Sequence, residues 1–179
     1  MSNVLAIEEF NEGIGSVEEI LHSLKLFKGI DGFEEVHSDL CAMFELRAFS
    51  LDERLINEGD TGDSLFVLCR GKVRILKTTV TGDEYRVVDL DGAEHAYFGE
   101  MALLTADKRS ASIMALEEVD CLVATREKFD AFSKKNPLFA IEVVKRIAVR
   151  MAEHLKRANE DNATLYQALI EEVSSGKHS

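Results

Sequence analysis

The chain has 179 residues, of which 46 % are hydrophobic and 30 % are charged, and it contains one proline. This composition excludes disordered and low-complexity chains, and the length favours one core over two full-sized domains. The 21 basic and 33 acidic residues give a net charge of −12, which would repel nucleic acids and anionic lipid surfaces. We therefore expect no nucleic-acid partner and no membrane partner. The sequence has no basic and then apolar leader, which predicts a cytoplasmic protein.

The cysteines and histidines lack the spacing of a metal site or a disulfide framework. Cys41, Cys69 and Cys121 are odd in number and far apart, which predicts reduced, buried thiols. None of the five histidines has the H-E-x-x-H spacing of zinc ligands, and the sequence contains no nucleophile elbow and no Walker A loop. We therefore predict no metal, no cofactor and no enzymatic activity.

Two helices are expected before residue 45. Ser16-Val-Glu-Glu19 has the capping-box spacing, in which the serine oxygen and the glutamate satisfy each other's amide donors, and it predicts a helix over 17–26. Apolar residues at steps of three and four predict a second helix over 33–44. An acidic, loosely held segment, 1–16, precedes both helices.

From Glu45 onward the pattern changes to short runs rich in branched residues, separated by turn residues such as Gly59-Asp60 and Thr81-Gly-Asp83. The runs cover residues 65–68, 72–76, 85–90, 111–116 and 120–124. Regular short strands with tight turns predict a mainly β sandwich or barrel flanked by helices.

After residue 125 the pattern returns to helix. Residues 126–135 form one short amphipathic segment, and Asn136-Pro137 begins a second helix that runs to about residue 173. Steps of four and three along it give a coiled-coil seam: Val144, Ala148, Met151, Leu155, Ala158, Asn162, Leu165 and Leu169. The start of this face can pack on the chain's own barrel, but a helix of about 36 residues is roughly 54 Å long. The seam on its distal part has no barrel surface to cover and therefore predicts a homodimer, in which the Asn162 side chains of the two copies face each other.

Residues 98–112, F-G-E-M-A-L-L-T-A-D-K-R-S-A-S, contain the strongest candidate for a binding site. Gly99 permits a close turn, Glu100 begins one helical turn with free amides, and Arg109, which we expect to begin the next strand, follows nine residues later. A guanidinium and amides suit a phosphate, and a carboxylate beside them accepts a hydrogen bond from a sugar hydroxyl. The alternative is a surface ion pair between Glu100 and Arg109, and local chemistry alone favours it.

The same stretch resembles the phosphate-binding cassette of cyclic nucleotide-binding domains, F-G-E-x-A-L followed by R-[AST]-A. Residues 58–68 and the hairpin at 70–73 are similar to the E-G-D-x-G-D-S stretch of that family. The resemblance runs from about residue 26 to residue 157. It implies an eight-stranded antiparallel β-roll, also called a double-stranded β-helix or jelly roll, with N-terminal helices and a long C-terminal helix. The catabolite activators and the regulatory subunits of protein kinase A have this type of domain.

The resemblance also implies roles for residues. Glu100 would accept the ribose 2′-hydroxyl, Arg109 would pair with the cyclic phosphate, and Leu103 would repack against the helix hinge. The implied ligand-binding residues are Phe98, Gly99, Glu100, Met101, Ala102, Arg109, Ser110 and Ala111. The amides of Gly99, Ala102 and Ala111 with the Ser110 side chain would complete the anion cradle.

Departures from the family affect the choice of ligand and the role of the chain. The Thr-Ser pair that grips adenine in the bacterial catabolite activator falls on His154-Leu155, so His154 is a possible base contact and base selectivity stays open. Leu51-Asp52 replaces a Pro-Gly turn, and residues 91–95 replace the Pro-Gly-Asp before the cassette. The chain also ends where a winged helix-turn-helix would begin, which argues against direct transcription-factor function.

We therefore predict a stand-alone bacterial sensor of cAMP, or less favourably cGMP, that rearranges its C-terminal helices and signals to a separate protein. A degenerate interaction or dimerisation module of the same fold is the alternative, and a hydrolase of the cyclic phosphate is a distant third. The expected parts are an N-terminal segment 1–16, a nucleotide-binding domain 17–126, hinge and dimerisation helices 127–173, and a tail 174–179.

Overall fold

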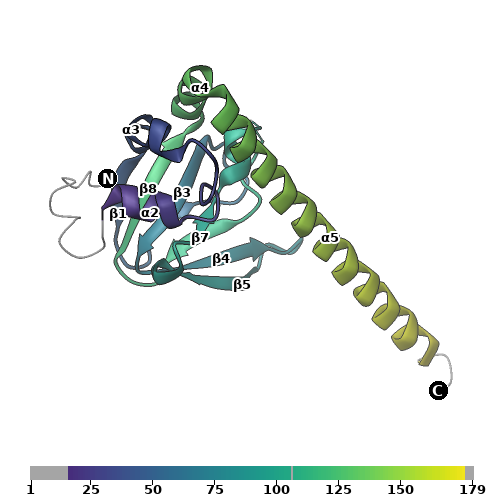
Figure 1. The fold of residues 1–179 in the computed structure, drawn as a ribbon. Helices are drawn as coiled ribbons and strands as arrows, with labels where there is room; N and C mark the ends of the chain where they lie inside the picture. Colours follow the sequence, from purple (N-terminus) through teal and green to yellow (C-terminus); the bar gives the residue numbers. More distant parts are fainter. Residues whose placement is uncertain (1–15, 106, 176–179) are drawn as a thin grey trace. The chain divides into compact units, whose positions relative to one another are not determined.

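Eight antiparallel strands form two four-stranded sheets (Figure 1), which confirms the predicted β-roll. The first sheet has the order β1 (Glu45–Phe49), β8 (Val119–Thr125), β3 (Ser64–Arg70), β6 (Tyr97–Phe98). The second has the order β2 (Arg54–Ile56), β7 (Ser112–Ala115), β4 (Lys72–Thr78), β5 (Glu84–Asp91). This computed structural model describes residues 16–105 and 107–175. The predicted segment 1–16, apart from Ser16, and residues 176–179 of the predicted tail lie outside the described residues.

Contacts divide the chain into two compact units, 1–143 and 144–179, and each is described by itself. The core of the first unit lies between the two sheets. Its central residues are Phe49, Ile56, Phe66, Leu68, Val73, Phe98, Ile113, Ala115, Val119, Cys121 and Val123. The inner strands β3 and β8 are buried along nearly their whole length, and they carry two of the cysteines. Cys69 and Cys121 are buried free thiols as predicted, whereas Cys41 on α3 is only half-buried.

The five predicted strand runs correspond to β3, β4, β5, β7 and β8. The runs of branched residues did not indicate β1, β2 and β6 as separate strands, although the family resemblance implied a strand at Leu55, within β2. β2 has three residues and β6 has two, so neither is long enough to show an alternating pattern.

The N-terminal helices are α2 (Val17–Ser23) and α3 (Phe33–Met43). The predicted capping box is present, because the Glu19 amide donates to Ser16 Oγ at 3.2 Å and the Ser16 amide donates to the Glu19 carboxylate at 2.9 Å. α2 ends three residues earlier than expected. The reason is that Leu24, Leu26 and Phe27 are all buried, and one helix face cannot bury all three.

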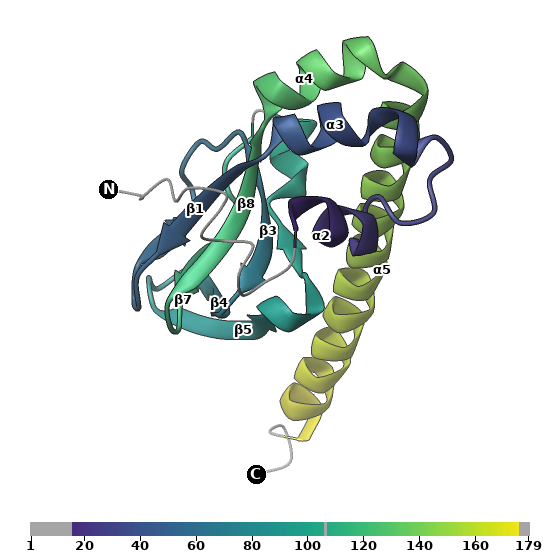
Figure 2. The same ribbon diagram turned by 60° about the vertical axis from the view of Figure 1, so that its left-hand side comes forward.

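The first unit ends with α4 (Arg126–Lys135) and the start of α5 (Pro137–Ser175), which confirms the two predicted helices. α4 lies beside α3 (Figure 2). Lys135 Nζ contacts the Asp39 carboxylate of α3 at 2.6 Å, and the Asn136 side chain donates to the same carboxylate at 3.2 Å. Lys128 Nζ contacts Glu45 of β1 at 2.5 Å. Polar contacts therefore hold α4 against α3 and β1.

In the second unit, α5 continues as one helix, and its described residues beyond Met151 are exposed. The seam residues Leu155, Leu165 and Leu169 have exposed fractions of 64 %, 67 % and 56 %. Across residues 16–105 and 107–175, none of the helices combines the length and the apolar content that crossing a bilayer requires.

Candidate functional site

The candidate site begins where β6 ends. Gly99 has φ 75° and ψ 13°, and it precedes a single 3₁₀ turn, η2 (Glu100–Leu103). A Cβ atom at Gly99 would lie 2.8 Å from the Ser64 carbonyl oxygen and 2.8 Å from Arg109 Nη1. Both the positive φ and the close approach therefore require glycine, and the predicted close turn followed by one helical turn is confirmed.

The Arg109 side chain crosses this turn and is half-buried. Its Nη2 donates to the Ser64 carbonyl at 2.9 Å, and its Nη1 donates to the Gly99 carbonyl at 3.4 Å. The guanidinium carbon lies 6.0 Å from the centre of the Phe66 ring. The guanidinium also lies directly over Gly62, where a Cβ would come within 1.9 Å of Nε. Backbone carbonyls and a glycine therefore fix the position of this cation.

The two sequence motifs, some 50 residues apart, are in direct contact. The Arg109 amide donates to the Asp60 carbonyl at 2.8 Å, and the Gly59 amide donates to the Arg109 carbonyl at 2.9 Å. Because its backbone pairs with this loop, Arg109 does not begin the next strand as predicted, and β7 starts only at Ser112. Residues 58–64, the E-G-D-T-G-D-S stretch, therefore line one side of Arg109.

Electrostatics at Arg109 depend on burial and on two neighbours. Burial lowers the pKa of the guanidinium, the Asp63 carboxylate acts in the opposite direction, and the positive charge of Arg126 lowers it further. A partly desolvated cation that donates to carbonyls gains when an anion binds beside it. The arrangement is therefore chemically suited to a phosphate.

The other predicted ligand-binding residues lie around this turn. Glu100 is 7 % exposed, and Ala102 and Leu103 are buried, while Met101 and Ser110 are exposed. Ala111 is half-buried. Phe98 stacks on Phe66 with ring centres 5.4 Å apart and planes within 10° of each other. Glu100 is buried, so the expected alternative of a surface ion pair with Arg109 does not describe it.

His154 belongs to the second unit and is exposed on α5. Its suggested contact with the base stays a prediction.

Apart from His154, sequence reasoning named no individual residue outside the cassette for the pocket, although Gly62, Ser64 and Phe66 all contact Arg109. The motif at 58–64 was the available signal. Arg126 was also missed, and its Nε donates to the Ala102 carbonyl at 2.7 Å. The signal for Arg126 is a cation in the first turn of a helix, where acidic residues are favoured.

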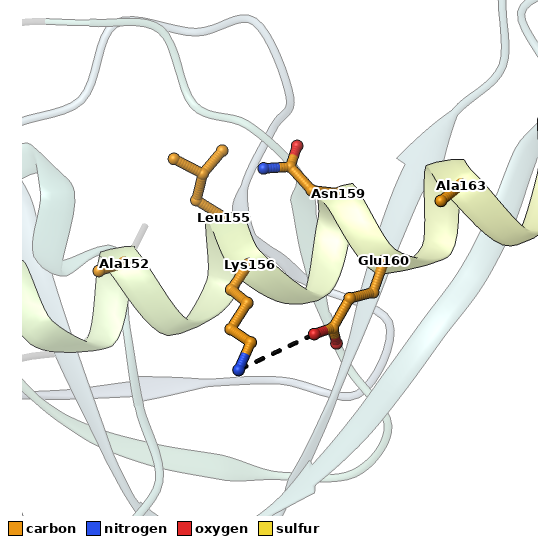
Figure 3. A pocket seen from close by; sticks show the side chains of 6 residues that line it. All are labelled: Ala152, Leu155, Lys156, Asn159, Glu160 and Ala163. Carbon is orange, nitrogen blue, oxygen red and sulfur yellow. Dashed lines mark ion pairs between the residues drawn. The ribbon is translucent and has the colours of Figure 1, made fainter.

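Two surface hollows lie elsewhere. One, of about 450 Å³, is formed by α5 alone (Figure 3), and its lining residues are Ala152, Leu155, Lys156, Asn159, Glu160 and Ala163. The other, of about 250 Å³, lies between α3 and α4 and includes Asp39, Met43 and Phe132. Neither is lined by Glu100 or Arg109, so neither is the site that the cassette would form.

A grouping that the sequence spacing did not reveal joins the two N-terminal helices. Glu18, Glu34 and His37 each place one potential ligand atom within 4.8 Å of the others. Exposed acidic groups often cluster in this way without an ion, so the grouping assigns no metal.

Comparison with known proteins gives a consistent result. Residues 46–136 match the family "Cyclic nucleotide-binding domain". The chain is 34 % identical to the Cyclic AMP receptor protein of Thermus thermophilus over 72 % of this chain and 57 % of that protein. It is 35 % identical to human cGMP-dependent protein kinase 2 over 62 % of this chain and 14 % of that protein.

A crystal structure of a cyclic nucleotide-binding domain from Methylobacillus flagellatus superposes with a TM-score of 0.68 and 25 % identity, over 88 % of this chain and 84 % of that one. The chain spans 57 % of the length of the Thermus relative and 14 % of the length of the human kinase. With the family match, the superposed fold and the cassette around Arg109 all in agreement, this chain belongs to the cyclic nucleotide-binding domain family.

Proposed function

We propose that this chain is a sensor that binds a cyclic nucleotide, with cAMP preferred over cGMP, and that it acts by binding and not by catalysis. The observation that carries the proposal is the half-buried guanidinium of Arg109, held by the carbonyls of Ser64 and Gly99, together with the buried residue Glu100 that follows Gly99 in the same turn. A cation and a hydroxyl acceptor beside one turn match the two polar parts of a cyclic ribose phosphate.

In this proposal Arg109 donates to the two exocyclic oxygens of the cyclic phosphate. The amides of Gly99, Ala102 and Ala111 and the hydroxyl of Ser110 complete the cradle. Glu100 accepts the ribose 2′-hydroxyl, and its burial strengthens that hydrogen bond because water competes less well for the carboxylate. Phe98 immediately precedes Gly99, and its stacking on Phe66 fixes the start of the turn.

One feature supports cAMP over cGMP. The Thermus relative, which is 34 % identical over 72 % of this chain, is named as a cyclic AMP receptor protein. Ser110 does not decide between the two ligands, because by the family resemblance a hydroxyl at this position occurs in cAMP-binding activators, while threonine accompanies cGMP preference in kinases and channels. The match to a cGMP-dependent kinase makes cGMP the competing ligand in every test.

The signal would leave through the helices that follow the barrel. We propose that ligand binding rearranges α4 and α5, and that α5 pairs with a second copy of the chain through its exposed seam. Leu155, Leu165 and Leu169 are apolar, exposed and in heptad register, which is the spacing of helices that pair. A separate downstream protein would read the rearranged helices.

Calorimetric titration of the purified chain with cAMP and cGMP tests the proposal. Arg109→Gln should weaken binding by about 2 to 5 kcal/mol, because the phosphate charge loses its partner in a desolvated site. Lys108→Gln is the matched control, because it removes a neighbouring exposed cation and should change affinity little.

Glu100 is tested through the ligand as well as through the protein. Replacing cAMP by its 2′-deoxy analogue should weaken binding to the wild type, whereas Glu100→Ala should bind the two nucleotides equally, since the acceptor is then gone. Equal affinity of wild type and Arg109→Gln would refute the pocket, and absence of binding by the wild type would leave the degenerate module as the better description.

A further inference from the structure

The long helix α5 carries a second, mainly apolar strip beside its seam. The members of this strip repeat at steps of three and four: Val149, Ala152, Lys156, Asn159, Ala163, Tyr166, Ile170 and Val173. All but the last follow a seam residue by one position, so the strip is rotated by about 100° about the helix axis. Its four large apolar side chains have exposed fractions between 55 % and 68 %. Pairing through the seam would therefore leave most of the strip exposed.

The strip is hollow over its first part and bulky over its second. Four of its members line the hollow of about 450 Å³ in Figure 3, and these are Ala152, Lys156, Asn159 and Ala163. The larger side chains of Tyr166, Ile170 and Val173 follow over the next turns. Helices pack closely where large side chains of one face small side chains of the other. A strip with both parts is complementary in shape to an inverted copy of itself.

Charge is divided along α5 in the same direction. Residues 144–157 contain five basic residues and one acidic residue, a net charge of +4 with histidine neutral. Residues 158–174 contain four acidic residues and no basic residue, a net charge of −4. In a contact through the strip, parallel copies would place Lys156 opposite Lys156, whereas antiparallel copies place each basic half beside an acidic half. Charge complementarity therefore favours an inverted second copy as the occupant.

We infer that the strip is a homotypic contact, in which α5 pairs antiparallel with α5 of a second copy of the chain. In the register centred on residue 161, Ile170 faces Ala152 of the second copy, and Tyr166 faces Lys156. The Tyr166 ring then lies against the alkyl stem and the ammonium group of Lys156. Such a contact is isologous, so every pairing occurs twice. Residues 149–173 span about 36 Å, which is more than three heptads.

This contact is additional to the proposed seam dimer and does not depend on nucleotide binding. The seam and the strip lie on different sides of α5, so both can be occupied at once. With both occupied, two seam dimers would be joined through a bundle of four helices.

Disulfide cross-linking of the full chain, without nucleotide, tests the contact. Both chains carry Cys41→Ser, which removes the half-buried thiol, and Ala152→Cys chains are mixed with Ile170→Cys chains under a mild oxidant. The mixture should give linked pairs at about fivefold or more the yield of either chain alone, because residue 152 faces residue 170 and not itself.

The matched control is a mixture of His154→Cys and Ala168→Cys chains. These two positions are also symmetric about residue 161, but they lie about half a turn around the helix from the strip and should not cross-link. Salt gives a second check. Raising NaCl from about 0.05 M to about 0.5 M should lower the 152–170 yield, because salt screens the attraction between opposite charges. Repulsion between parallel copies would be relieved instead.

Sedimentation over a range of concentrations provides a readout that needs no added thiol. Ile170→Asp places a carboxylate against Ala152 and should raise the dissociation constant of the strip contact by about tenfold or more. Ala168→Asp adds the same charge on the opposite side of the helix and should leave this dissociation constant unchanged.

Three results would overturn the inference. The first is a 152–170 yield no higher than that of the control mixture. The second is disulfide formation by Ala152→Cys chains alone and by Ile170→Cys chains alone, which would show that the copies are parallel. The third is equal association of the wild type and Ile170→Asp, which would leave the strip to a different protein. None of these results concerns nucleotide affinity, so the inference and the proposed nucleotide binding can fail separately.

Discussion

Gly62 lies under the guanidinium of Arg109, and no side chain fits between them. Gly62→Ala would place a Cβ 1.9 Å from Arg109 Nε, so the guanidinium must move while the backbone can stay. We expect nucleotide affinity to fall by about tenfold or more, which is about 1.4 kcal/mol, because the cation leaves its position over the turn. Calorimetric titration with cAMP measures the change.

The control for this variant is Gly82→Ala in the turn between β4 and β5. Gly82 has φ 93° and nothing within 4 Å of a built Cβ, so alanine strains only the backbone there. Stability should fall by about 1 kcal/mol while affinity stays unchanged. A Gly62→Ala protein that binds as tightly as the wild type would contradict the proposed position of Arg109.

Asp52 shows how a departure in sequence can keep the geometry of the family. Leu51-Asp52 replaces the usual Pro-Gly, yet Asp52 adopts φ 63° in the turn before β2. Aspartate tolerates the left-handed region better than most residues with a side chain. The change in sequence therefore leaves the left-handed turn in place.

At the scale of single elements, β5 is an edge strand whose acidic residues pair with arginines of β2 and β4. Arg54 of β2 holds the pKa of Glu84 below its ordinary value, and Arg74 of β4 does the same for Asp89. Lowered pKa values mean that the unfolded state binds more protons, so this stabilisation is complete above about pH 4.5 and is lost as the pH falls further.

We therefore expect the hydrogen-exchange protection factors of residues 84–91 to fall faster below pH 4.5 than those of the buried strand β3. High salt should reduce the difference, because the pairs are exposed and screened. Glu84→Gln should remove part of the decline in β5. Parallel loss of protection in both strands would show that the pairs do not act locally.

The elements also show what a sequence can and cannot reveal. Capping signals and periodicity located α2, α3, α4 and the long α5, since these depend on residues close in the chain. The strands β1, β2 and β6 depend on long-range pairing, and the early end of α2 depends on burying Leu24, Leu26 and Phe27 elsewhere. In the site, motif spacing predicted the turn and its arginine. A cation in the first turn of a helix was the one sequence signal at Arg126, and its contact with the Ala102 carbonyl was not predictable, because main-chain carbonyls carry no side-chain signature.

At the scale of the whole molecule, the seam of α5 predicts self-association. Leu165→Asp should raise the dissociation constant of a dimer by about tenfold or more, because two carboxylates would meet in an apolar layer. Asn162→Leu should strengthen association but relax the choice of oligomer. Sedimentation of the wild type and both variants over a range of concentrations measures these effects.

Gln167→Asp is the control for added charge, since Gln167 lies about half a turn around the helix from Leu165 and should not face the partner. Addition of cAMP provides a further check. If ligand changes dimer affinity, dimerisation must change ligand affinity by the same factor. A wild type that stays monomeric at tens of micromolar with and without cAMP would contradict the proposal that the seam of α5 forms a dimer.

The three free thiols differ in burial, and this difference lets their reactivity report on unfolding. Burial raises the pKa of Cys69 to about 12 and that of Cys121 well above its ordinary value, and the two lie on the inner strands β3 and β8. Because thiolates are the species that react with alkylating reagents, these two sites become modified only after the sheets separate. Cys41 is half-buried on α3 and reacts without that event. The rate at which Cys69 and Cys121 become modified therefore measures how often the β-roll opens, and no probe has to be engineered into the chain.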